Sequence, residues 1–201
     1  MAPESLFLNR AVVFASGLIY WVGVLVQARR VRRRIGKSPN LKPRGVKEKI
    51  LWLGWLTVIG LWLFTPFIAG GESLGAWAGI FFFHPATTVA GIVLIAVGYA
   101  ATLWSYSAMG KHWRIGINPT EQTTIVTEGP FRYVRHPIYC FQIVMLIGVV
   151  LLLPTIFSLL ALVLHFVCVW IKSSDEERFL LNKHDTSYRE YQSRTGRLFP
   201  K

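Results

Sequence analysis

Long runs of uncharged, mostly apolar residues alternate with short basic segments along this chain. Three of the runs, Ala11–Ala28, Ile50–Ala69 and Ala86–Met109, contain no Asp, Glu, Lys or Arg. Each is close to the length of about 20 residues that a helix needs to cross the hydrocarbon core of a bilayer. The pattern therefore predicts membrane-spanning helices at 11–28, 50–69 and 86–109.

A fourth run, Pro137–Ile171, is too long for one spanning helix. Its 35 residues carry no charge, and a single helix of that length would extend about 52 Å, against a core of about 30 Å. Pro154 lies near its middle, and proline interrupts a helix because it lacks an N–H and clashes with the preceding turn. We therefore predict an antiparallel helical hairpin, 137–153 and 155–172, and five spans in all.

Basic residues concentrate in alternate loops, and this predicts the orientation. Segment 29–49 carries ten Lys or Arg, and the tail from Lys172 carries seven. The loop 110–136 is also basic, whereas the loop 70–85 has no Lys or Arg. Because Lys and Arg are retained on the cytoplasmic side, we predict the N-terminus outside and the C-terminus in the cytoplasm.

The composition fits an all-α integral membrane protein of one domain, residues 1–201. Hydrophobic residues make up 53%, charged residues 16%, and the mean hydropathy is +0.43. A soluble domain has roughly 25% charged residues, so the soluble, disordered and coiled-coil classes are excluded. The net charge of +12 is explained by basic cytoplasmic loops, which also attract anionic headgroups. No nucleic-acid partner is predicted.

Several standard signatures are absent from the sequence. Cys140, Cys168 and the five histidines show no metal-ligand spacing, so no metal site is predicted. The chain has neither a Walker-type loop nor a GxGxxG motif. A nucleotide-like cofactor would therefore be held without a Rossmann fold. The run Ala11–Ala28 is interpreted as a retained anchor rather than a signal peptide, because the heavy charge follows it.

Three polar clusters lie at the predicted cytoplasmic ends of the spans. They are the basic segment Gly110–Asn118, the segment Thr124–Tyr139, and the acidic run Asp175–Glu177. In the second cluster His136 precedes a predicted helix, whose free N–H groups suit an anion or carboxylate. Simpler interpretations exist for each: an interfacial loop, a helix cap, and a solvated face on which Lys172 pairs with an acid four residues on.

The order of motifs in the C-terminal half resembles a known family. GPFRYVRHPIY, starting at Gly129, is followed by the apolar hairpin, then EERFLL, YREYQ and a final RTGRLFP. This combination resembles the isoprenylcysteine carboxyl methyltransferase family and its phospholipid methyltransferase relatives. The resemblance covers roughly residues 110–201, while the first three spans match only as generic hydrophobic helices.

The resemblance implies a cytoplasmic pocket for S-adenosylmethionine, built from residues 110–201. The positions that match its cofactor contacts are Asn118, Thr124, Ile125, Val126, Phe131, His136, Pro137, Tyr139, Glu176 and Glu177. Thr124–Val126 corresponds to a strand-like segment. For the substrate side, the resemblance indicates Glu176 with Lys172, where the family often has arginine, and Arg197 as a further candidate for binding a substrate carboxylate.

The predicted function is methyl transfer from S-adenosylmethionine to a lipid or lipid-modified acceptor in the bilayer. O-methylation of an isoprenylcysteine-type carboxylate is favoured, and N-methylation of a phospholipid amine remains open. A second hypothesis is an NADPH-dependent sterol- or steroid-type reductase, with Arg114, Arg132 and Arg135 near the cofactor phosphates. A third is a non-enzymatic scaffold or transporter component, for which His165 is the one ionisable side chain within the predicted spans. The sequence does not specify the acceptor or the oligomeric state.

Overall fold

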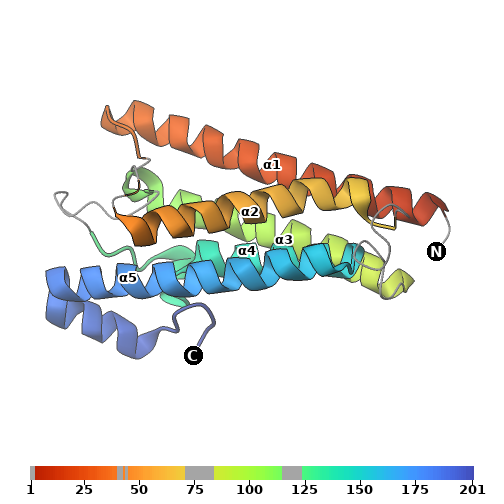
Figure 1. Ribbon diagram of the computed structural model, residues 1–201. Helices are drawn as coiled ribbons and strands as arrows, with labels where there is room; N and C mark the ends of the chain where they lie inside the picture. Colours follow the sequence, from red (N-terminus) through yellow and green to blue (C-terminus); the bar gives the residue numbers. More distant parts are fainter. Residues whose placement is uncertain (1–2, 40–42, 44, 71–83, 115–123) are drawn as a thin grey trace.

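The computed structural model describes residues 3–39, 43, 45–70, 84–114 and 124–201, and these form a helical bundle (Figure 1). No strand occurs among these residues, which is consistent with the predicted all-α class. The elements are α1 (Pro3–Ile35), α2 (Val46–Ile68), α3 (Pro85–Met109), η2 (Gly110–His112), η3 (Gly129–Arg132), α4 (Pro137–Leu152) and α5 (Ile156–Arg194).

Four of the helices, α1, α2, α3 and α5, are long and apolar enough to cross a membrane. The predicted spans 11–28, 50–69, 86–109 and 155–172 coincide with parts of these helices. Only 22% to 33% of the most apolar stretch of each is buried inside the protein. The outward apolar surface needs a cover that a bilayer supplies. Helix α4 has 16 residues, or about 24 Å, so the count of five spans stays a prediction.

The predicted hairpin is present, with its turn at Leu153–Thr155 between α4 and α5. Thr155 caps α5: its Oγ1 accepts a hydrogen bond from the Ser158 backbone N–H, and its own N–H donates to Ser158 Oγ, at 3.2 and 3.1 Å. Such a reciprocal cap satisfies two N–H groups that would otherwise lack partners. The proline and the cap together explain why the chain reverses here.

Helix α5 continues well beyond the predicted end at Lys172. No glycine or proline interrupts residues 173–184, so the helix extends until Asp185, where φ is 32°. There the chain reverses, and the segment after Asp185 runs back beside α5 (Figure 1). This returning segment is the short C-terminal helix that the sequence predicts.

Glycines allow α3 and α4 to approach each other closely. A Cβ on Gly98 would lie 2.8 Å from the carbonyl oxygen of Phe141, and a Cβ on Gly148 would lie 2.7 Å from that of Gly91. Backbones in contact through small residues are typical of helix pairs within membranes, where apolar burial alone does not drive association. The hairpin is thereby held against α3.

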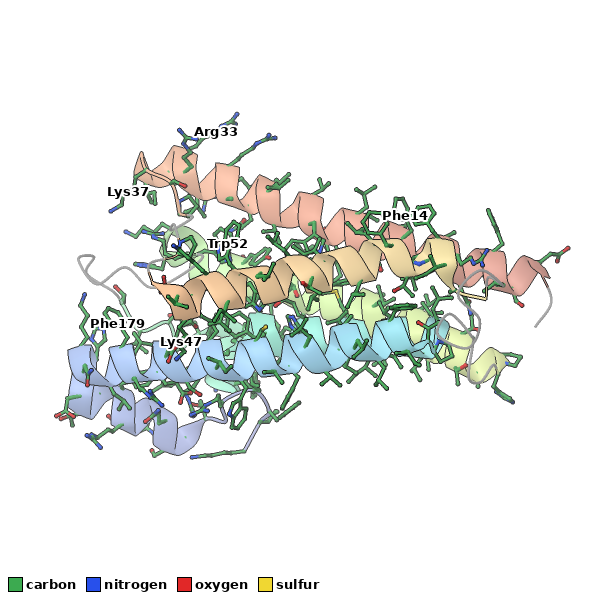
Figure 2. All side chains as sticks on the ribbon, in the orientation of Figure 1. Phe14, Arg33, Lys37, Lys47, Trp52 and Phe179 are labelled. Atoms are coloured by element: carbon green, nitrogen blue, oxygen red, sulfur yellow. The ribbon has the colours of Figure 1, made fainter. Side chains whose placement is uncertain are left out.

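The basic ends of the helices gather at one end of the bundle. Figure 1 shows that the end of α1, the start of α2, the end of α3 and the start of α4 lie there, together with the last part of α5. Lys47, at the start of α2, forms an ion pair of 2.7 Å with Asp175 of α5. Figure 2 shows Arg33, Lys37, Lys47 and Phe179 at this end and Phe14 toward the other. The described parts of the three polar clusters therefore share one end.

Candidate functional site

The C-terminal segment binds back onto the turn before α4 through backbone hydrogen bonds. Val134 and Gly196 form a parallel β-bridge. The N–H groups of Arg135 and His136 donate to the carbonyl oxygens of Gly196 and Arg197, at 2.9 and 3.1 Å. These bonds join the turn around His136 to the C-terminal segment, which is about 60 residues later in the sequence. The two segments together form one wall of the candidate site.

Glu177 is the centre of a buried cluster of charges. Its side chain is 4% exposed, and Oε1 accepts a hydrogen bond of 2.7 Å from Arg135 Nε. Arg197 Nη2 donates to the other oxygen, Oε2, at 2.9 Å, and Gln192 Nε2 lies 3.4 Å from it. Arg197 also lies over the ring of Trp170, with 4.9 Å from its guanidinium carbon to the ring centroid. Both oxygens of Glu177 are therefore taken by partners within the protein.

Glu176, one residue earlier, lies in a different setting. Its side chain is 22% exposed, and Oε1 accepts a hydrogen bond of 3.0 Å from the Tyr139 hydroxyl. Oε2 lies 3.4 Å from His136 Nδ1. The rings of His136 and Tyr139 are stacked, with centroids 5.7 Å apart. This carboxylate faces an imidazole and a phenol, and part of it remains accessible to a ligand.

The charges around His136 determine its protonation. Burial alone would lower the pKa of this imidazole, but its contacts with Glu176 and Glu177 outweigh burial and raise the pKa above its ordinary value of 6.5. Nε2 lies 3.5 Å from Glu177 Oε1, yet the geometry is not that of a hydrogen bond and this buried nitrogen has no hydrogen-bond partner among the described residues. A ligand that accepts a hydrogen bond would fit there.

The same surroundings keep Glu177 ionised. Its burial taken alone would raise the pKa, but the contacts from His136, Arg135 and Arg197 lower the pKa to about 2. A buried carboxylate is retained in its charged form only when its partners compensate for the lost hydration. Glu177 is therefore a fixed negative charge that orders the arginines around it.

The structure brings together most of the predicted site residues, but not all. Phe131 is buried in η3, and its carbonyl oxygen accepts a hydrogen bond of 2.6 Å from the Tyr191 hydroxyl. Pro137 opens α4 as predicted, and His136 precedes it at the N-cap without capping through its side chain. The N-cap position of His136 is confirmed, and the simpler interpretation of its side chain as a cap does not hold, because the imidazole turns toward the two glutamates.

The remaining predicted positions are Thr124–Val126, Lys172 and Asn118. Thr124–Val126 adopt irregular backbone rather than a strand. Lys172 and Glu176 do not form the expected ion pair, since Glu176 turns toward α4. Asn118 lies outside the described residues.

Sequence reasoning missed two members of the site. The sequence suggests Arg135 only as a ligand for a cofactor phosphate, whereas in the structure it is the counter-ion of Glu177. The signal for this role is its position beside His136 together with the acids that follow the last span. Trp55 of α2 has its ring centroid 6.0 Å from that of Tyr139. Nothing in the sequence near Trp55 marks it, because only the packing of α2 against the hairpin brings it there.

Comparisons with known proteins cover part of the chain, including α4 and most of α5. The sequence model of the phospholipid methyltransferase family matches residues 86–186, from α3 to just past the turn in α5. The nickel-cobalt-cadmium resistance protein NccN of Alcaligenes xylosoxydans xylosoxydans is 27% identical over 109 residues, which are 54% of this chain and 50% of that protein. The chain thus spans about half the length of that relative. In the described part of the chain, no three His, Cys, Asp or Glu side chains are grouped so that they would hold a metal ion.

Proposed function

Because this chain belongs to the phospholipid methyltransferase family, we propose that it transfers a methyl group from S-adenosylmethionine to a lipid acceptor held in the membrane. The observation that carries the proposal is the pair of neighbouring glutamates within the family-matched segment. Glu177 is neutralised by Arg135 and Arg197, while Glu176 stays partly exposed beside His136 and Tyr139. One acid orders the site and the other is available to a ligand.

The donors and acceptors of this site fit the proposed cofactor. S-adenosylmethionine carries an amino group and ribose hydroxyls, which suit the Glu176 carboxylate, and its own carboxylate suits the unpartnered Nε2 of His136. The face of Tyr139 suits a sulfonium or an adenine ring through cation–π attraction or stacking. The residues that would hold the cofactor are therefore Glu176, His136 and Tyr139, with Phe131 and Pro137 shaping the wall behind them.

When bound, the cofactor supplies an electrophilic methyl group on a positively charged sulfur. Transfer of that group is an in-line displacement that needs little proton transfer, so positioning and exclusion of water supply most of the catalysis. The fixed charges at Glu177, Arg135 and Arg197 hold the wall rigid, and the stacked rings of His136 and Tyr139 exclude water.

The charges of the site favour an amine as the methyl acceptor. Arg135 and Arg197 both donate to the oxygens of Glu177, so neither guanidinium presents its full fork of donors to a substrate carboxylate. Glu176 is the partly exposed acid of the cluster and would attract a protonated lipid amine. That ammonium must lose one proton, to the Glu176 carboxylate or to solvent, before its nitrogen attacks the methyl group. N-methylation of a phospholipid amine is thus our first candidate for the acceptor.

O-methylation of an isoprenylcysteine-type carboxylate is the second candidate, and Lys172 is the observation in its favour. This lysine is half-buried on α5, one turn before Glu176, and forms no ion pair among the described residues. A lysine ammonium binds a carboxylate as a point charge rather than as a planar fork. Methylation of a phospholipid amine by Lys172→Met at the wild-type rate would favour the first candidate.

We further propose that the site faces the cytoplasm and that the chain crosses the membrane five times. The end of α1 and the start of α2, with Arg33 and Lys47, lie at the end of the bundle where α4 begins (Figures 1 and 2). This asymmetry of basic residues follows the positive-inside rule. The cofactor would then enter from the aqueous side, and the lipid acceptor would enter sideways from the bilayer.

Binding of S-adenosylhomocysteine to purified protein tests the proposal. We expect Glu176→Gln and His136→Ala to weaken binding at least tenfold, because each removes a polar partner of the ligand. The matched control is Glu190→Gln, an exposed acid on the segment after Asp185 whose ion pair among the described residues is with Arg194. Glu177→Gln is less suitable, since it leaves two arginines without their counter-ion and would destabilise the fold.

Two outcomes would contradict the proposal. One is wild-type affinity for S-adenosylhomocysteine in both Glu176→Gln and His136→Ala. The other is binding of NADPH without binding of S-adenosylhomocysteine, which would favour a reductase. The buried pairing of Arg135 with Glu177 argues against a reductase, because it leaves that guanidinium unavailable to a cofactor phosphate.

A further inference from the structure

Two buried polar groups in the interior of the bundle have no hydrogen-bond partner within the described part of the chain. His165 of α5 is 4% exposed, and its Nε2 has no hydrogen-bond partner among the described residues. The indole nitrogen of Trp55 on α2 is likewise buried and unpartnered. The two rings face each other at 6.5 Å between centroids. Buried polar atoms without partners cost free energy, so a pair of them in contact calls for a ligand.

This pair is continuous with the site at the end of the bundle. His165 and Glu176 are 11 residues apart, which is about three helical turns, so they lie on the same face of α5 about 16 Å apart. Trp55 contacts both His165 and Tyr139, and Tyr139 donates to Glu176. A column of polar and aromatic side chains thus runs from the accessible carboxylate into the apolar interior.

We propose that Trp55 and His165 form a subsite for an uncharged oxygen in the linker region of the lipid acceptor, such as the ester carbonyl of a diacyl glycerolipid. A charged group at this depth would be costly, whereas an ester carbonyl accepts a hydrogen bond from an indole or imidazole N–H without carrying charge. The uncharged pair lies about three helical turns deeper than the accessible carboxylate of Glu176, just as the ester of such a lipid lies deeper in the bilayer than its headgroup. This inference rests on the proposed function for the identity of the ligand.

The ester group can be tested directly with a pair of lipids that differ only there. We would measure the thermal stabilisation of the purified protein by diacyl phosphatidylethanolamine and by its dialkyl ether analogue with the same chain length. An ether lacks the carbonyl acceptor. We expect the apparent affinity for the diacyl lipid to be roughly three to ten times higher, the ratio that one hydrogen bond provides.

Two substitutions locate the effect, and a third is the control. Trp55→Phe and His165→Phe remove the unpartnered nitrogens while keeping an aromatic ring, and each should bring the preference for the ester close to one. Trp62→Phe should retain the preference, because the indole of Trp62 on the same helix already donates to Ser16 Oγ at 3.2 Å. Equal binding of the two lipids by the wild type, or an unchanged preference in both Phe variants, would overturn the proposal.

The outcome separates this subsite from the proposed function. Methyl transfer to the diacyl and dialkyl lipids with the same KM would refute the subsite and leave the methyltransferase intact. A preference for the ester that disappears in Trp55→Phe, in a protein that binds no S-adenosylhomocysteine, would support the subsite and refute the methyltransferase.

Discussion

Two adjacent glutamates illustrate how much a single position on a helix matters. In sequence Glu176 and Glu177 are equivalent acids after an apolar run. On α5 they point about 100° apart, so Glu177 meets Arg135 and Arg197, and Glu176 meets Tyr139. Glu177 is buried and structural, whereas Glu176 is partly accessible. The sequence places both acids near the site but does not distinguish them, because the distinction depends on which side of α5 the C-terminal segment binds.

The protonation of His136 predicts how stability depends on pH. Its pKa is raised in the folded protein, so its contribution is fully present below the ordinary value of 6.5 and is lost as pH rises through the raised pKa. Glu177 has a lowered pKa, so its contribution is present above its ordinary value of 4.5 and is lost as pH falls toward about 2. We expect the Tm of the purified protein to be highest between pH 4.5 and 6.5 and to fall on the alkaline side.

The variant His136→Gln tests whether His136 causes the decrease in Tm at alkaline pH. Glutamine cannot be protonated, so we expect the decrease in Tm between pH 6 and 8.5 to be smaller than in the wild type. The control is His84→Asn, which changes an exposed histidine at the start of α3 and keeps an acceptor for the Ala86 N–H. An alkaline decrease of the same size in His136→Gln and the wild type would show that His136 is not the group responsible.

At the scale of elements, local signals predicted the helices and the hairpin but not their extent. Pro154 in a long apolar run was sufficient to predict the reversal between α4 and α5, since that signal is local. The length of α5 was underestimated because charge was used to end it at Lys172, whereas the helix ends only where Asp185 adopts a positive φ. The contact of Trp55 with Tyr139 depends on tertiary packing, and no local pattern encodes it.

Close packing of α3 on α4 predicts that Gly98 does not tolerate a side chain. A Cβ there would lie 2.8 Å from the carbonyl oxygen of Phe141, so Gly98→Ala must push the hairpin away from α3. We expect a loss of about 1–3 kcal/mol, seen as a lower Tm in detergent. The control is Gly60→Ala in α2, where an added Cβ meets nothing within 4 Å. Equal Tm values for the two variants would contradict this account of the packing.

At the scale of the molecule, the charged site lies at one end of the bundle, and hydrogen bonds between helices hold the other end together. The site, the Lys47–Asp175 ion pair and the arginines at the end of α1 share one end (Figure 2). At the opposite end, Asn9 Nδ2 of α1 donates to the Leu152 carbonyl oxygen at 2.9 Å, and Arg10 donates to that of Ala69. These bonds tie α1 to the last turns of α4 and α2. Once one loop is assigned to one side of the membrane, the order of the helices therefore assigns a side to each end of the bundle.

Chemical labelling of introduced cysteines would locate that loop and test the number of crossings. In a chain with Cys140 and Cys168, both buried, replaced by alanine, we would introduce His84→Cys, Arg33→Cys or Lys201→Cys, one at a time. All three positions are exposed. A membrane-impermeant maleimide applied to intact cells should label the first and spare the other two, and lysis should make all three reactive. Arg33→Cys and Lys201→Cys reacting from opposite sides would require an odd number of crossings between α1 and the C-terminus. That result would contradict the five-span topology and the proposal that the end of α1 and the C-terminus both face the cytoplasm.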